Sequence, residues 1–82
     1  GDVYKRQAKA DVIRHALATL GIDDPARAVM IGDRRHDVEG AAATGLAAIG
    51  VLWGYGSREE LQTAKPAFIA EDIPALRQLL LG

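Results

Sequence analysis

The sequence has no cysteine, no long hydrophobic run and little excess charge of either sign. Without cysteine it can form neither a disulfide nor a thiolate metal site. Its longest apolar stretches are far shorter than a membrane span, and the N-terminus lacks the apolar core of a signal peptide. The 10 lysines and arginines are scattered among 11 acidic residues, so no basic face for nucleic acid is indicated. We therefore expect a cytoplasmic protein that binds neither nucleic acid nor membranes.

The chain has 82 residues, which is enough for one small domain. Hydrophobic residues make up 49% of it, an ordinary fraction for a globular protein. A domain of this size buries only about 60–65% of the surface that its unfolded chain exposes, so its stability should be marginal.

Hydrophobic periodicity and turn residues predict alternating helices and strands. Helices are expected over residues 10–20, 37–44, 57–64 and from 72 onward, and strands over 28–31, 46–52 and 67–70. The first strand lacks polar alternation, so both faces of the sheet should be covered. The inward-facing residues of the first helix should be Val12, Ile13, Ala16, Leu17 and Leu20, and those of the last helix Ile73, Leu76, Leu79 and Leu80. This order predicts an α/β fold, a short three-stranded parallel sheet flanked by helices.

The stretch from Val29 to Asp37 carries the clearest chemistry. A short apolar run ends in Gly32-Asp33, and Asp37 follows at the start of a helical pattern. Open α/β sheets bind ligands at the carboxyl ends of their strands, where two neighbouring carboxylates repel each other unless a cation lies between them. Mg²⁺ is the simplest such cation, because it takes oxygen ligands and keeps waters and phosphate in its remaining positions.

Each of these acids also has an ordinary structural interpretation. Asp33 is a residue type that commonly caps a helix, and Asp37 would favour the first turn of a helix through the dipole alone. Arg34, Arg35 and His36, between the two acids, form a solvated turn in the simplest interpretation.

Two further patterns follow the second strand. Trp53-Gly54-Tyr55-Gly56 is expected to be a loop whose glycines need positive φ values, since a lone Gly-x-Gly is weak evidence for a nucleotide site. Ser57 and Glu60 have the spacing of a capping box, in which Ser57 caps the helix and Glu60 reaches back.

Taken together, three features of the chain resemble the C-terminal half of a haloacid dehalogenase (HAD)-like phosphatase. They are Gly32-Asp33-x-x-x-Asp37 after an apolar strand, Lys9 at the start of the preceding helix, and a following strand that ends near Gly50-Val51. The run from Val51 to Ser57, with Glu60-Leu61 after it, is similar to the phosphoglycolate phosphatase branch. The resemblance covers residues 8–82 and implies part of a Rossmann-like, three-layer HAD core.

The resemblance also implies roles for individual residues. Asp33 would be a catalytic residue and a direct Mg²⁺ ligand, and Asp37 would support the metal, often through a coordinated water. Lys9 would neutralise the phosphate of a small phosphorylated substrate, such as a phosphoglycolate-like or nucleotide-like metabolite. Such enzymes hydrolyse phosphate monoesters through an aspartyl-phosphate intermediate.

The sequence departs from the family pattern at its beginning. It contains no Asp-x-Asp-x-Thr motif to supply the nucleophile, and the cap that selects the substrate is absent. We therefore expect a C-terminal fragment that is inactive alone and whose partner is the missing N-terminal half. Residues 1–7 are expected to be unstructured and foreign to the native protein, because they resemble translated sequencing-adapter sequence.

Two other interpretations stay open at this point. A receiver-like domain also combines acidic residues, a lysine and a phosphorylated aspartate, but its lysine follows its acids, whereas Lys9 precedes Asp33. A non-catalytic α/β interaction module would use the carboxylates only as helix caps. In the fragment interpretation, the first strand should have an unpaired apolar edge that favours association.

Overall fold

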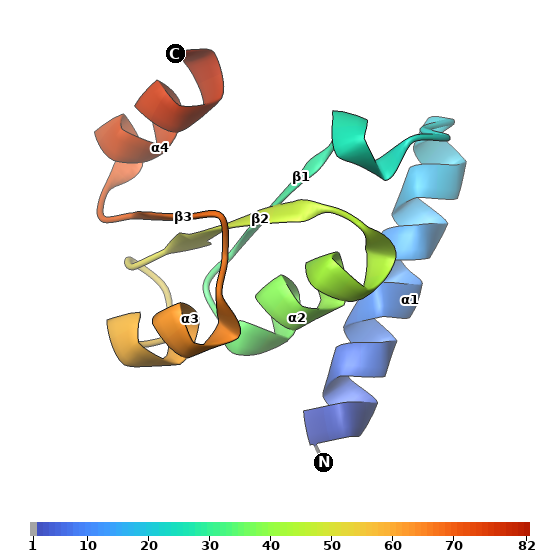
Figure 1. The fold of residues 1–82 in the computed structure, drawn as a ribbon, viewed down its shortest axis with the longest axis horizontal. Coiled ribbons are helices and arrows are strands. Elements are labelled where there is room, and N and C mark those ends of the chain that lie inside the picture. Colours follow the sequence, from blue (N-terminus) through green and yellow to red (C-terminus); the bar gives the residue numbers. More distant parts are fainter. Residues whose placement is uncertain (1) are drawn as a thin grey trace.

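The computed structural model of the protein describes residues 2–82, in which helices and strands alternate (Figure 1). A short 3-10 helix at Pro25–Arg27 precedes the first strand. The strands are β1 (Val29–Gly32), β2 (Ala47–Val51) and β3 (Phe68–Ala70), and the helices are α1 (Asp2–Leu20), α2 (Arg35–Thr44), α3 (Arg58–Ala64) and α4 (Ile73–Leu81). The predicted α/β class is confirmed.

The three strands form one parallel sheet in the order β1-β2-β3. Ile31 of β1 is paired with Ile49 of β2, and Gly50 of β2 is paired with Ile69 of β3. Because the strands are parallel, their carboxyl ends meet at one edge of the sheet, as do the loops that follow them. This arrangement brings the segment after β1 next to the segment after β2.

The ends of the helices follow from identifiable residues. Gly21 ends α1 with a φ of 71°, and Gly45 ends α2 with a φ of 82°, which are left-handed conformations that glycine adopts without steric cost. Asp72 caps α4 by accepting a hydrogen bond from the amide of Ala75 at 2.8 Å. Glycine thus sets where α1 and α2 end, and aspartate sets where α4 begins.

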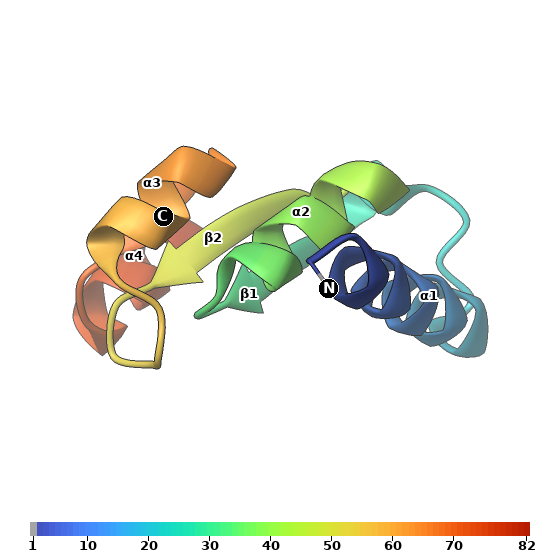
Figure 2. The same cartoon turned by 90° about the horizontal axis from the view of Figure 1, so that it is seen from below.

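One face of the sheet carries the main hydrophobic core. Figure 2 shows α2 and α3 on one side of the strands and α4 on the other, with α1 beside α2. Leu61 of α3 and Ala41 of α2 are fully buried, and Ile13 of α1 is nearly so. The full cluster consists of Ile13, Val38, Ala41, Leu46, Ala48 and Leu61.

The opposite face is only partly covered, contrary to the prediction that both faces would be buried. There α4 packs over Ile49, Val51 and Ala70, through Ala75 and Leu76. Val29 and Ile31 of β1 stay 40% and 41% exposed, because α4 does not extend to that edge. The three-layer arrangement is therefore complete only near β3.

The first helix begins earlier than predicted, at Asp2, so the expectation of an unstructured segment is wrong for residues 2–7. This segment contains no proline or glycine to interrupt a helix, and it continues the packed helix with exposed side chains at residues 3–7. Residue 1 lies outside the described part of the chain. Among residues 2–82, no helix is both long and apolar enough to cross a membrane.

The predicted inward faces of α1 and α4 are only partly correct. In α1, Ile13 is buried, but Val12 and Leu20 are 63% and 71% exposed, because α1 packs against α2 and not flat on the sheet. In α4, Leu76 packs on the sheet, whereas several predicted core residues are exposed: Ile73, Leu79 and Leu80. The cause is the same in both helices, since only one side of each meets another element.

Candidate active site

Asp33 follows β1 directly and is held by the loop after β2. Its Oδ2 atom accepts a hydrogen bond from the amide of Tyr55 at 2.9 Å, and its carbonyl oxygen accepts one from the amide of Gly56 at 2.9 Å. The N-cap of α2 is Arg34, so Asp33 does not have the capping role of the ordinary structural interpretation. Two neighbouring loops at the carboxyl edge of the sheet therefore fix this carboxylate.

The glycines of that loop make the close approach possible. A Cβ atom on Gly54 would collide with the Asp33 carboxylate, and one on Gly56 would collide with the Asp33 carbonyl oxygen. Neither glycine is among the described residues with positive φ, so the prediction that they supply such values is wrong. They are needed because there is no room for a side chain against Asp33.

Asp37 lies in the first turn of α2 and ties the acidic segment together. Its Oδ2 atom accepts hydrogen bonds from the backbone amides of Asp33, at 3.2 Å, and Arg34, at 3.3 Å. Its Oδ1 atom lies 2.9 Å from Nζ of Lys9. Asp37 therefore holds both the backbone of its own loop and the lysine predicted to bind phosphate.

Lys9 reaches Asp37 from α1 because α1 and α2 approach closely at a glycine. A Cβ atom on Gly40 would lie 2.7 Å from Cγ of Lys9, so the lysine stem runs directly over that position. The Asp37 side chain is 14% exposed and the Lys9 side chain 39% exposed. The cation is thus half-buried beside a largely buried carboxylate.

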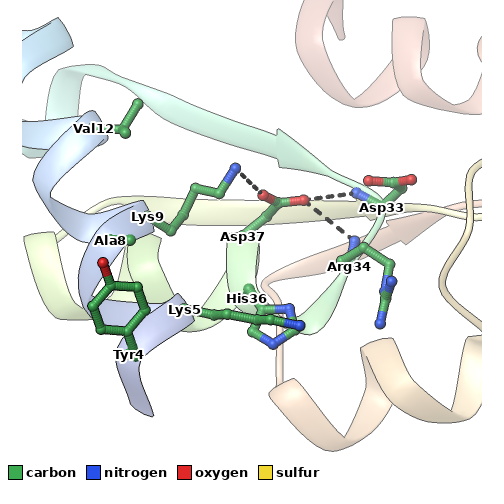
Figure 3. Close-up of a pocket in the computed structure, with 9 residues that line it drawn as sticks. All are labelled: Tyr4, Lys5, Ala8, Lys9, Val12, Asp33, Arg34, His36 and Asp37. Carbon is green, nitrogen blue, oxygen red and sulfur yellow. Dashed lines mark hydrogen bonds and ion pairs between the residues drawn. The ribbon is translucent and has the colours of Figure 1, made fainter. Parts of the chain in front are cut away.

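These groups line one side of a pocket of about 500 Å³, shown in Figure 3. In that view the ammonium group of Lys9 points toward Asp37, which lies between Lys9 and the backbone of Asp33. The lining residues are Tyr4, Lys5, Ala8, Lys9, Val12, Asp33, Arg34, His36 and Asp37. The three site residues predicted from the sequence, Lys9, Asp33 and Asp37, thus share one pocket.

Glu60 contacts the same segment from α3. Ser57 caps α3 as predicted, accepting a hydrogen bond from the Glu60 amide at 3.0 Å. The Glu60 carboxylate does not complete the capping box but accepts hydrogen bonds from Nε of Arg34 and the amide of Arg35, both at 2.9 Å. The hydrogen bond from Arg34 is the main cause that lowers the pKa of Glu60, and it raises the pKa of Arg34. The expectation of a freely solvated turn is therefore wrong for these two arginines.

The carboxylate oxygens at this site are ligands of the kind that Mg²⁺ prefers. An ionised carboxylate has about four acceptor positions, so Asp33 keeps capacity beyond its bond from Tyr55. The described residues contain no cluster of three or more His, Cys, Asp or Glu side chains that could hold a metal alone. Mg²⁺ is commonly held by one or two carboxylates with waters and phosphate, so Asp33 and Asp37 fit it.

The fold and the acidic loop match part of a core of the haloacid dehalogenase type. The sequence profile of the HAD-hydrolase-like family matches residues 6–76, so this chain belongs to that family. This match confirms the resemblance to HAD-like phosphatases and rejects the interpretation as a receiver-like domain.

Curated relatives point in the same direction. The chain is 44% identical over 75 residues to a 5'-nucleotidase of Pseudomonas aeruginosa, covering 92% of this chain and 34% of that protein. It is 44% identical over 77 residues to the tyrosine-protein kinase PtkA of Mycobacterium tuberculosis, with 92% and 26% covered. It is 38% identical over 71 residues to a phosphoglycolate phosphatase of Neisseria meningitidis, with 83% and 30% covered. The chain thus spans about a third or less of these relatives.

A solved structure shares the fold. The crystal structure of a predicted phosphatase from Clostridium acetobutylicum matches with a TM-score of 0.81 and 43% identity. The match covers 88% of this chain and 33% of that protein.

Several residues that shape the site were not predicted from the sequence. Gly40 has no side chain and so leaves room for Lys9, and Gly54 leaves room for Asp33 in the same way. Glu60 binds Arg34 and the amide of Arg35, which lie between the two acids in sequence. A usable signal for Gly40 was a glycine inside the predicted helix, three residues after Asp37. Glu60 lies 26 residues from Arg34, and no local pattern connects them.

Proposed function

We propose that this chain supplies the metal-binding and phosphate-binding part of a Mg²⁺-dependent phosphatase. The observation that carries the proposal is the meeting of Lys9, Asp33 and Asp37 in one pocket beyond the carboxyl end of β1. Two carboxylates that can hold a metal and one cation, all fixed by backbone and side-chain contacts, match the charge stabilisation that phosphoryl transfer requires.

In this proposal Asp33 and Asp37 are the metal ligands, and Lys9 binds the phosphate. When bound, Mg²⁺ would offset negative charge on the transferring phosphoryl group. Asp37 orients the Lys9 ammonium group through the 2.9 Å ion pair, and the amides of Tyr55 and Gly56 fix the position of Asp33. The chain thus contributes charges that are already arranged before a substrate arrives.

The proposed substrate is a phosphate monoester of a small metabolite. The names of two relatives, a 5'-nucleotidase and a phosphoglycolate phosphatase, support this class. The sequence has no Asp-x-Asp pair to supply the nucleophile, and the chain spans about a third of its relatives. We therefore propose that the nucleophile and the cap belong to an N-terminal half of the enzyme, which is the partner of this chain. The cytoplasmic location stays a prediction.

The test is hydrolysis of p-nitrophenyl phosphate with Mg²⁺ by the purified chain, alone and mixed with the N-terminal part of a related phosphatase. We expect activity only in the mixture. The variant Asp33→Asn should abolish it, whereas Asp24→Asn, which changes a residue that caps the 3-10 helix, should not.

The other outcomes are equally informative. Activity of the chain alone would contradict the proposal that the nucleophile lies elsewhere. If the mixture is inactive and Mg²⁺ binds wild type and Asp33→Asn equally, the metal role is wrong and the non-catalytic interaction module is favoured.

A further inference from the structure

We infer that Glu60 is a positioning residue for the metal site, which keeps the guanidinium group of Arg34 away from Asp33 and Asp37. The inference rests on the proposed role of these two aspartates as Mg²⁺ ligands. It assigns a function to a contact between α3 and the loop after β1 that the capping-box pattern did not predict.

The contact joins parts of the chain that are far apart in sequence. Oε2 of Glu60 lies 2.9 Å from Nε of Arg34, and Oε1 lies 3.4 Å from Nη2, so the carboxylate faces the guanidinium group with both oxygens. Oε2 also accepts the hydrogen bond from the amide of Arg35, the first residue of α2. One side chain thus holds both the arginine and the backbone beside the acids.

Arg34 is the cation that could compete with a metal at this site. It lies between the two aspartates in sequence, and its own amide donates to Asp37. Its guanidinium group keeps its charge at any physiological pH and binds carboxylates through two parallel hydrogen bonds. Besides Glu60, the carboxylates whose charges act on Arg34 are those of Asp33 and Asp37, so these are the alternative partners. In Figure 3 the guanidinium group is turned away from Asp37.

Glu60 is itself held in position by the fold. Its amide donates to the capping hydroxyl of Ser57, and the next residue, Leu61, is fully buried in the core. The Glu60 side chain is 23% exposed, compared with 45% for Arg34, so the acid is the more confined partner. A carboxylate anchored in this way directs where the flexible arginine lies.

The test measures Mg²⁺ affinity of the 82-residue chain by isothermal titration calorimetry in a double-mutant cycle. Glu60→Gln removes the charge and keeps the shape, and we expect it to weaken Mg²⁺ binding about tenfold, as is typical of changes to groups that orient metal ligands. In an Arg34→Met background the same change should have no effect, because the competing cation is gone. Glu59→Gln, a change of the exposed neighbour, is the matched control and should bind Mg²⁺ like wild type.

A loss of affinity from Glu60→Gln that is equal in both backgrounds would overturn the inference, and so would no loss in either. Should Glu60→Gln fail to fold, Glu60→Asp takes its place, since it keeps the charge but shortens the reach.

A second measurement separates this inference from the proposed function. If the wild-type chain binds no Mg²⁺, the metal role fails, and nuclear Overhauser contacts of the Arg34 Nε–H proton test Glu60 independently. We expect contacts to Glu60 in wild type and to the first turn of α2, near Asp37, in Glu60→Gln. An arginine that lies in the same place in both proteins would overturn the inference.

Discussion

Nζ of Lys9 lies 2.9 Å from Oδ1 of Asp37, which joins α1 to the first turn of α2. The close helix contact at Gly40 lets the lysine cross α2, and Oδ2 of the same aspartate holds the backbone of the acidic loop. The pair therefore connects the proposed phosphate-binding cation to the proposed metal ligands, and its removal should affect chemistry more than folding.

Replacing Lys9 with methionine tests this difference. Lys9 is 39% exposed and Asp37 only 14%, but Asp37 keeps its bonds from two backbone amides, so loss of the ion pair should cost about 1–2 kcal/mol of unfolding free energy. Phosphatase activity of the reconstituted enzyme should fall about 100-fold or more, as is typical when one charge-stabilising group is lost. Lys65→Met, at the end of α3, is the control and should keep full activity. Equal activity of the two variants would contradict the proposed role of Lys9.

Replacing Gly54 with alanine should displace Asp33, because the new Cβ atom would collide with its carboxylate. We expect a loss of about 1–3 kcal/mol of stability and weaker Mg²⁺ binding. Gly21→Ala is the matched control, since Gly21 has a φ of 71° and open space around it. That variant should also lose stability, by about 1–2 kcal/mol, but should bind Mg²⁺ normally. Calorimetry measures Mg²⁺ affinity and urea unfolding measures stability, so the two effects can be separated. Unchanged Mg²⁺ binding in Gly54→Ala would contradict the prediction that Asp33 is displaced.

The contact between Glu60 and Arg34 makes stability depend on pH in the acidic range. Because the pKa of Glu60 is lowered in the folded state, its stabilising contribution is complete above its ordinary value of about 4.3. This contribution is lost as the pH falls through the lower, folded-state pKa. The raised pKa of Arg34 leaves that residue charged throughout this range.

Urea unfolding of wild type and Glu60→Gln between pH 2 and 7 should therefore give stability curves with their full separation above about pH 4.3, and the separation should shrink to nothing as the pH falls below that value. The control Glu59→Gln should follow the wild-type profile. A constant difference between wild type and Glu60→Gln at every pH would show that the charge of Glu60 is not the cause.

The exposed face of β1 should promote self-association. Val29 and Ile31 are 40% and 41% exposed on an edge strand, and such strands pair readily with other chains. Ile31→Lys should shift the chain toward the monomer in sedimentation velocity measurements. Val3→Lys, at a valine that is 63% exposed on α1, is the control and should leave the association unchanged. A wild-type chain that is monomeric at every concentration would contradict this prediction.

Much of the fold could be predicted because it depends on local signals. Gly21, Gly45 and Asp72 end or begin helices through conformations and hydrogen bonds that involve only neighbouring residues. The sequence pattern likewise placed Asp33 directly after β1 and Asp37 at the start of the next helix, where the structure has them.

The rest depended on contacts between distant segments. Burial of Val12 and Ile73 could not be judged from periodicity, since a helical apolar stripe becomes core only where another element covers it. The hydrogen bond between Tyr55 and Asp33, and that between Glu60 and Arg34, arise because parallel strands bring the segments that follow β1 and β2 to one edge of the sheet. No pattern within either segment contains that information.

The uneven covering of the sheet also determines where the native state opens first. On the side of α4 a small cluster joins Ile49, Val51 and Ala70 to Leu76, whereas contacts from α1, α2 and α3 hold the acidic loop. Amide hydrogens of α4 should therefore exchange with solvent sooner than those of β2, through a local opening that leaves the rest folded. Limited proteolysis should cut first near Glu71, which is exposed between β3 and α4. The pocket that contains Asp33 would then stay folded after the C-terminal helix has opened.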